Sequence, residues 1–300
     1  MAPYSNAVEM RVVSFENDGA TIYSGIADPE WTAGSVPMGG YLLGMVIEAT
    51  NQLQSDTTHK DPLHVTAHFL RLVSTGPLEV HVRRVRSGKG FSNLTAELVQ
   101  GSEIKVTSHL VALDALPSAA LTRYPLPMAK MVHFSHHVTI SRDISIGERH
   151  EKLTHTGNGS GGVEEGRWHE LQPGERITPS FLPLICDVFP GLLPVAAYPL
   201  KRAWFATVTM SMEFMAPIPR GTRTIGVFGS GRFIENPQGR HDFYAEVWTA
   251  PANITDKDAE LPENWREGQR CLGVSHQMAL VIPFEGEHKK GKNGGKKSNL

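Results

Sequence analysis

The alternation of apolar and polar residues predicts one helix followed by four strands in the first third of the chain. From Pro37 onward, apolar residues recur at helical spacing behind two glycines, Gly39 and Gly40. Four strand-like segments follow, separated by turns that contain Gly or Pro, at about 64–72, 78–86, 91–99 and 104–113. Connections of hairpin length indicate an antiparallel sheet, which we expect to curl around the helix.

The same order of elements returns in the second half. An apolar helix is expected from Phe181 to about Phe189. Strands are expected after it, at about 204–216, 222–232, 242–249 and 271–282. Between the halves, residues 116–170 are rich in Pro, His and Gly, and we interpret them as a crossover linker that holds the first strand or two of the second unit.

Two sequence echoes support a duplication of one unit. The segments 108–113 and 275–280 agree at four of six positions, at an offset of 167 residues, while Phe69 and Gly76 correspond to Phe214 and Gly221 at an offset of 145. The difference of 22 residues fits an insertion in a polar loop at about 253–269. We therefore expect four parts, namely an N-terminal unit at 10–115, the linker at 116–170, a C-terminal unit at 171–285 and a disordered basic tail at 286–300.

Composition narrows the classes of function. The chain has 300 residues, 40% of them hydrophobic, which is enough for a substantial core. Its 29 basic and 31 acidic residues give no sign of nucleic-acid binding. Neither a signal peptide nor an apolar run of about 18 residues is present, so no membrane span is expected.

The cysteines and the C-terminus bear on location. Cys186 and Cys271 lie in apolar surroundings, which favours buried free thiols in a reducing compartment such as the cytoplasm. The last three residues, Ser298-Asn299-Leu300, resemble a degraded peroxisomal address, so peroxisomal import is the alternative location. The histidines between 133 and 169 have irregular spacing and no neighbouring cysteine, so we expect solvated side chains there and no metal site.

Several longer segments resemble one enzyme family. "HVTAHFLR" and "RSGKGFSNLTAELVQ" in the first half, with "FLPLICDVFP", "FATVTMSMEFMAPIP" and "GVSHQMALVIP" in the second, are similar to acyl-CoA thioesterase II and the thioesterase-like superfamily over residues 10–285. The resemblance implies an α+β double hotdog, in which two tandem units each wrap an antiparallel sheet around a central helix. It also implies hydrolysis of an acyl thioester, carried by CoA or by an acyl carrier, without a cofactor.

In that family an Asp, a Ser or Thr, and a Gln of the C-terminal unit orient the attacking water. Gln277 falls on the family's Gln, while Thr209 stands at the position that we assign to the Asp, and Ser230 is the nearest candidate for the Ser or Thr. A threonine hydroxyl positions water but cannot accept a proton at neutral pH, so an acid is missing from this set. The alternative for Gln277 is a structural amide with satisfied hydrogen bonds.

The start of the first helix is a second candidate region. Backbone N–H groups at Met38, Gly39, Gly40 and Tyr41 are unpaired at a helix start and are candidates to bind an oxyanion or substrate. The alternative is that the two glycines let the helix pack closely against its surroundings.

Further titratable residues lie on predicted strands or helices. His64 and His68 share one strand face and are candidates for a base in a pseudo-symmetric second site, although strand histidines of this kind are more often partly exposed. Glu213, Asp242 and Asp187 are acids of the second unit, and we expect Asp187 on the solvent side of its helix.

Three functions remain open from the sequence. The first is hydrolysis of an acyl thioester by an oriented water. The second is non-hydrolytic hotdog chemistry in secondary metabolism, such as cyclisation, dehydration or product release from a polyketide-like chain, and the third is an acyl-binding module without turnover. The apolar outer edges of a double hotdog also favour a homodimer.

Overall fold

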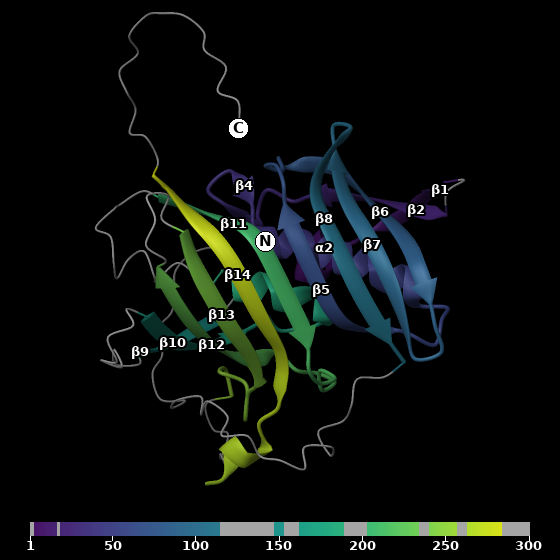
Figure 1. Ribbon diagram of the computed structural model, residues 1–300. Helices are drawn as coiled ribbons and strands as arrows, with labels where there is room; N and C mark the ends of the chain where they lie inside the picture. Colours follow the sequence, from purple (N-terminus) through teal and green to yellow (C-terminus); the bar gives the residue numbers. More distant parts are fainter. Residues whose placement is uncertain are drawn as a thin grey trace, which may run out of the picture.

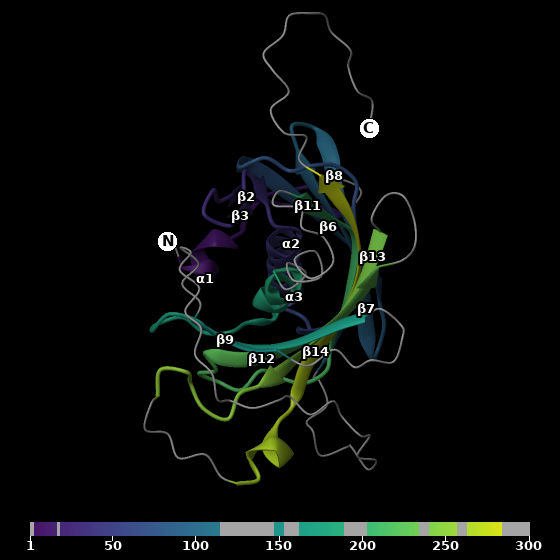
Figure 2. The same cartoon turned by 90° about the vertical axis from the view of Figure 1, so that its left-hand side faces the viewer.

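Apart from one small two-stranded pair, the strands that the structure describes form one curved antiparallel sheet that encloses two helices. The structure is a computed structural model, and it describes residues 3–16, 19–114, 147–152, 162–188, 203–233, 240–256 and 263–283. Figure 1 shows the broad face of the sheet, and Figure 2, turned by 90°, shows helices α2 and α3 side by side inside its curve.

The first half of the chain contributes a short helix, a long central helix and six strands of this sheet. Its elements are α1 (Tyr4–Ala7), β1 (Arg11–Phe15), β2 (Ala20–Ala27), the small pair β3 (Thr32–Ala33) and β4 (Val36–Pro37), α2 (Gly39–Gln54), β5 (Asp61–Phe69), β6 (Gly76–Ser87), β7 (Phe91–Gln100) and β8 (Glu103–Leu113).

The second half repeats this order with a much shorter central helix. Its elements are β9 (Gly147–Lys152), β10 (Gly162–Glu170), the 3-10 turn η2 (Pro179–Phe181), α3 (Leu182–Asp187), β11 (Ala203–Phe214), β12 (Thr224–Phe233), β13 (Arg240–Thr249), the 3-10 turn η4 (Trp265–Gly268) and β14 (Cys271–Pro283). Strands β9 and β10 lie inside the segment that the sequence analysis treated as a linker.

The order of strands in the sheet is symmetric about its centre. The described strands run β1-β2-β6-β7-β8-β5 in the first half and β11-β14-β13-β12-β10-β9 in the second. Each half therefore has the same internal order, read in opposite directions, and the halves join where β5 pairs with β11. This arrangement is what duplication of one unit and edge-to-edge pairing of the two copies through β5 and β11 would produce.

Burial follows the two periodicities that the sequence shows. Along β7 and β13, buried residues alternate with partly exposed ones, as expected of strands with one face on the core. Helix α2 is buried on most of its circumference, from Gly40 through Thr50, because the sheet wraps around it and α3 covers what the sheet leaves open.

The polar loop of the second half accounts for the unequal repeat offsets. Strands β7 and β8 are joined by a tight turn at Gly101-Ser102, whereas their counterparts β13 and β14 are joined by the segment 250–270. The described part of that segment, residues 250–256 and 263–270, packs against the sheet, where Ile254 and the partly buried Trp265 cover the buried rings of Trp168 and Trp248. It therefore forms a small second core instead of a solvated loop.

The structure differs from the sequence prediction at three places. Strands β1 and β2 were not predicted, because all five residues of β1 are exposed and β2 begins with a continuous buried run, so neither shows clear alternation. The helix expected at 181–189 is shorter and begins as a 3-10 turn, with prolines at its start. His169, expected among solvated linker histidines, is buried on β10.

Some sequence predictions fall outside the described residues. These are most of the linker, with the histidines at 133, 136, 137 and 155, the end of the second helix at Phe189, the basic tail 286–300, and the terminal Ser298-Asn299-Leu300. Within the described part, no helix has both the length and the apolar character needed to span a membrane.

The two central helices touch at the start of α2. A Cβ atom placed on Gly40 would lie 2.3 Å from the carbonyl oxygen of Pro183 and 2.7 Å from Cα of Leu184, both backbone atoms of α3. One turn later, a Cβ on Gly44 would lie 2.5 Å from the carbonyl oxygen of Ser180. Glycine at these positions is therefore required for the helices to approach each other this closely.

Replacement of Gly40 by alanine should destabilise the fold. In an exposed helix this change would stabilise by up to about 1 kcal/mol, but here the added methyl group meets backbone, so we expect a net loss of about 2 kcal/mol or more in the free energy of unfolding. Urea unfolding measures it. Gly90→Ala is the matched control, because its Cβ would have no neighbour within 4 Å. Equal stability of the two variants would contradict the close contact.

Candidate active site

The last residue of α3, Asp187, turns its carboxylate toward the first turn of α2. The backbone N–H of Gly40 donates a hydrogen bond of 2.8 Å to Oδ2. The hydroxyl of Thr207, on β11, donates one of 2.9 Å to Oδ1. The backbone of Gly39 also stabilises the carboxylate. Donors from both halves of the chain therefore meet on one acid.

The sequence prediction for Asp187, an exposed acid on the solvent side of its helix, is wrong. The five residues before it in α3, Leu182 to Cys186, are all buried, so this short helix has no continuous solvent face. It is enclosed by α2 on one side and by the sheet on the other. Asp187 lies at the edge of that packing and is itself only partly exposed.

Opposing effects set the pKa of Asp187. Burial, the largest effect, raises the pKa, because a carboxylate loses hydration in these surroundings. The hydrogen bonds from Gly40, Thr207 and Gly39 stabilise the charged form and lower the pKa, but the net result is a pKa above the ordinary value for aspartate. A carboxylate of this kind is a stronger base than one in water.

Gln277, on β14, lies next to this acid. Its side chain is 5% exposed, and its Nε2 donates a hydrogen bond of 3.0 Å to the carbonyl oxygen of Cys186, the residue before Asp187. This bond fixes the orientation of the amide, since a carbonyl can only accept. The amide oxygen Oε1 is buried and has no hydrogen-bond partner among the described residues. A buried acceptor of this kind is suited to a hydroxyl group or a water molecule.

A β-bulge brings Thr207 into the site. On β11, Thr207 lies opposite Ala279 and Thr209 lies opposite Met278, so one extra residue is inserted between them. In a regular strand Thr207 and Thr209 would share a face. Because of the bulge, Thr207 faces α3, whereas Thr209 shares the outer face of the sheet with His68, its partner on β5.

Thr209 and Ser230, which the sequence analysis grouped with Gln277, lie on the other face of the sheet. Gln277 is paired with Met210 and Phe243, both buried. Ser230 is paired with Tyr244, whose ring lies 4.9 Å from that of His276 on the outer face. The structure therefore does not bring Thr209 or Ser230 together with Gln277.

The four secondary candidates also lie on the outer face. His68 is paired with Thr209, and His64 with Glu213. The Nε2 atom of His64 is 2.8 Å from the hydroxyl oxygen of Thr66. Asp242 is paired with Met278, one residue away from the inward-facing Gln277. None of them approaches Asp187, which lies on the inner side.

Of the two roles that the sequence left open for the glycines at the start of α2, the structure shows close packing, while their N–H groups donate to Asp187 and are not free for an oxyanion. Met38 occupies the N-cap position without a side-chain cap, and its N–H, expected to be unpaired, donates a 3.2 Å hydrogen bond to the carbonyl oxygen of Trp31. The side chain of Tyr41 instead points away from the site, since its hydroxyl donates a 2.7 Å hydrogen bond to the carbonyl of Ala7, and burial raises its pKa to about 12.

Comparison with known proteins shows what this chain is similar to. Residues 27–113 match the profile of the acyl-CoA thioesterase N-terminal domain. A protein of Thermobifida fusca assigned as a thioesterase II shares the fold with a TM-score of 0.70 at 20% identity, over 94% of this chain and 98% of that one. An acyl-CoA thioesterase II of Mycobacterium marinum gives a TM-score of 0.66 at 14% identity, over 95% and 99% of the two chains.

A third similar structure is a hot dog protein of unknown function from Alicyclobacillus acidocaldarius, with a TM-score of 0.67 at 17% identity over 93% of this chain and 97% of that one. No curated protein matches the sequence significantly. The chain has a double hotdog fold, and residues 27–113 are similar to the acyl-CoA thioesterase N-terminal domain. The fold class and the family resemblance predicted from the sequence are thereby confirmed.

Two residues of this double hotdog site, Asp187 and Thr207, were missed from the sequence. Asp187 was considered but placed on the solvent side, and Thr207 was not considered. One signal pointed to Thr207. At the offset of 145 its counterpart is Pro62, and a proline inside a strand often marks a bulge. The first half indeed carries a register shift between Pro62 and His64.

Loss of the Thr207 hydroxyl should change the ionisation of Asp187. In Thr207→Val one donor to the carboxylate is gone, so the pKa of Asp187 should rise further and the free energy of unfolding at neutral pH should fall by about 1–2 kcal/mol. Carboxyl chemical shifts followed by NMR over pH measure the pKa. Thr209→Val, two residues along but on the outer face, should leave it unchanged. A shift of the same size in both variants would refute the geometry.

Proposed function

We propose that this double hotdog hydrolyses acyl thioesters, with Asp187 as the base that activates water. The observation that carries the proposal is the convergence of Asp187, Thr207 and Gln277 from three elements of the C-terminal unit. An Asp, a Ser or Thr, and a Gln are the residue types that the family resemblance implies. The acid that the sequence analysis considered lost is supplied by α3 instead of β11.

The geometry suggests how these residues divide the work. A water molecule beside Asp187 would donate one hydrogen bond to the carboxylate and the other to Oε1 of Gln277, the buried acceptor. Its oxygen would then attack the carbonyl carbon of the thioester while Asp187 accepts the proton. When the carbon–sulfur bond breaks, that proton passes to the departing thiolate, which leaves a carboxylic acid and a free thiol.

The hydrogen bonds around Asp187 define the roles of its neighbours. Thr207 and Gly40 hold the two carboxylate oxygens, so the acid is fixed in orientation before substrate arrives. Gln277 is held in turn by the carbonyl of Cys186. Because both glycine N–H groups stabilise Asp187, we assign them to the base and not to the oxyanion.

An acyl-CoA is the substrate that the similarities favour. The matching profile is that of an acyl-CoA thioesterase domain, and the structure from Mycobacterium marinum is an acyl-CoA thioesterase II. A carrier-bound chain is the alternative thioester. Non-hydrolytic chemistry rested on the apparent loss of the acid, and the position of Asp187 removes that ground.

Thiol release from acyl-CoAs of graded chain length tests the proposal. The wild-type chain should release thiol, while Asp187→Asn should lower kcat by about 10²-fold or more, because the amide cannot accept the proton. Gln277→Ala should lower it by about 10²-fold, as expected for loss of an oriented polar contact.

Asp242→Asn is the matched control, since it removes an acid of the same unit from the outer face and should leave kcat unchanged. Absence of thiol release from wild type on every chain length would exclude hydrolysis. Tight binding of acyl-CoA under those conditions would instead identify an acyl-binding module.

The rate of hydrolysis should depend on the protonation of Asp187. The carboxylate is the active form, so kcat/KM should fall as pH decreases through the pKa of Asp187 in the free enzyme. Because that pKa is raised by burial, the acid limb should lie above the ordinary range for aspartate. Thr207→Val should shift the limb to still higher pH, and a profile with no acid limb in this region would exclude Asp187 as the base.

A further inference from the structure

The two halves are related by an approximate two-fold axis that passes between β5 and β11. Thr66 is paired with Ser211, which is also its counterpart at the repeat offset of 145. On either side of this pair, His64 faces Glu213 and His68 faces Thr209, as an isologous contact requires. Any site in one half therefore has a counterpart position in the other, at the opposite end of the two central strands.

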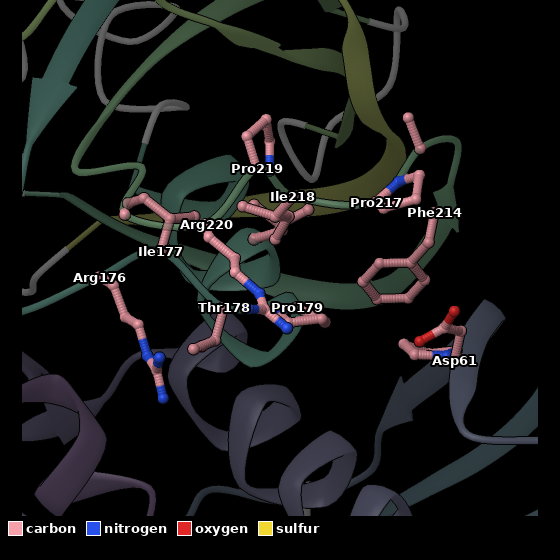
Figure 3. Close-up of a pocket in the computed structure, with 14 residues that line it drawn as sticks. Asp61, Arg176, Ile177, Thr178, Pro179, Phe214, Pro217, Ile218, Pro219 and Arg220 are labelled. Carbon is pink, nitrogen blue, oxygen red and sulfur yellow. The ribbon is translucent and has the colours of Figure 1, made fainter. Parts of the chain in front are cut away.

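At the position related to the Asp187 site the structure has a cavity of about 270 Å³ (Figure 3). Its lining includes Pro62, which is the counterpart of Thr207, and Phe214, which is the counterpart of Phe69. Thr178 and Pro179, at the start of the short second helix, also line it, just as Met38 and Gly39 begin the first. The cavity is thus the second of two related sites.

This second site lacks the groups that we assign to hydrolysis. Pro62 has no hydroxyl where Thr207 has one. The counterpart of Gln277 at the offset of 167 is Leu110, which is buried and apolar. Retention of a cavity without these polar groups is suited to binding rather than to activation of water.

The walls of the cavity are apolar and rigid. Four of the lining residues are prolines, which fix the backbone and offer no N–H: Pro62, Pro179, Pro217 and Pro219. The loop that carries Pro217 and Pro219 is held by the Thr222 hydroxyl, which donates a 2.7 Å hydrogen bond to the carbonyl of Pro219, and by the N–H of Ile177, which donates one of 2.9 Å to the carbonyl of Thr222. A preformed cavity of this kind binds a ligand at low cost in ordering.

The charges at the cavity are mostly positive. Arg176 and Arg220 line it and are exposed, and neither forms a hydrogen bond or ion pair with any other residue that the structure describes. Asp61 is the one acid in the lining, and it already has an interaction partner. Figure 3 shows Arg220 beside Thr178 and Pro179, with Arg176 and Asp61 on opposite sides of it.

We propose that this cavity is a second, non-catalytic binding site for a long-chain carboxylate. The apolar walls would take the hydrocarbon chain, and the unpaired guanidinium groups of Arg176 and Arg220 would bind the carboxylate, for which the planar guanidinium group is well matched. The site does not depend on the proposed hydrolysis, since it contains none of the residues assigned to that reaction.

Photolabelling locates the ligand directly. The intact chain is irradiated with dodecanoate that carries a diazirine in its chain, and labelled peptides are mapped by mass spectrometry. Label is expected on residues 176–182 and 214–221, to the same extent in wild type and in Asp187→Asn. Label found only near Asp187 and Thr207 would overturn the proposal, whereas thiol release, measured separately, reports on hydrolysis alone.

Charge variants test the head group. Arg176→Gln combined with Arg220→Gln should reduce labelling by roughly tenfold or more at ligand concentrations below saturation, as for loss of charge-assisted hydrogen bonds. Arg86→Gln, which removes an exposed arginine from β6, should have no effect. Equal loss in both would overturn the site-specific role of the two arginines.

Two further comparisons complete the test. Dodecanol with the same diazirine should label at least tenfold more weakly than the carboxylate, and equal labelling would overturn recognition of an anion. Ala216→Phe, which fills the cavity from its wall, should block labelling while thiol release persists. In competition, displacement by dodecanoyl-CoA but not by dodecanoate would overturn the carboxylate as the ligand.

Discussion

The close contact between the first turn of α2 and the backbone of α3 is the constraint on which the rest of this structure depends. Only a residue without Cβ fits at Gly40, where a methyl group would stand 2.3 Å from the carbonyl oxygen of Pro183. This contact brings the unpaired N–H groups of one helix to the end of the other, where Asp187 accepts them. The same packing that completes the core therefore also holds a carboxylate in partly buried surroundings and raises its pKa.

Most of the fold could be predicted from the sequence because most of its strands alternate and its central helix is apolar. The repeat echoes correctly placed an insertion between the last two strands, where Ile254 and Trp265 cover Trp168 and Trp248. Strand β1 could not be predicted, since all of its residues are exposed at the edge of the sheet. No local pattern distinguishes such an edge from a loop.

The candidate site was predicted less well, for a specific physical reason. Its location between the first helix and the second sheet, and the inclusion of Gln277, followed from comparison of the halves. Thr209 was assigned from the family resemblance, but one bulge on β11 turns Thr207 toward the inner face and leaves Thr209 on the outer face. The position of Asp187 could not be found from periodicity, because a six-residue helix enclosed on two sides has no exposed stripe from which a solvent face could be inferred.

The hydrogen bond from Gly40 to Asp187 joins the first repeat to the second, between residues 147 apart in sequence. The site therefore depends on both repeats. A single ancestral unit that paired with an identical copy would have had to keep every group needed at both related sites. In the fused chain the two copies differ, because Pro62 and Leu110 of the first half stand at the positions that Thr207 and Gln277 occupy in the second. Neither half alone supplies Gly40 together with Asp187, Thr207 and Gln277. The two halves made as separate chains would therefore not each form the site.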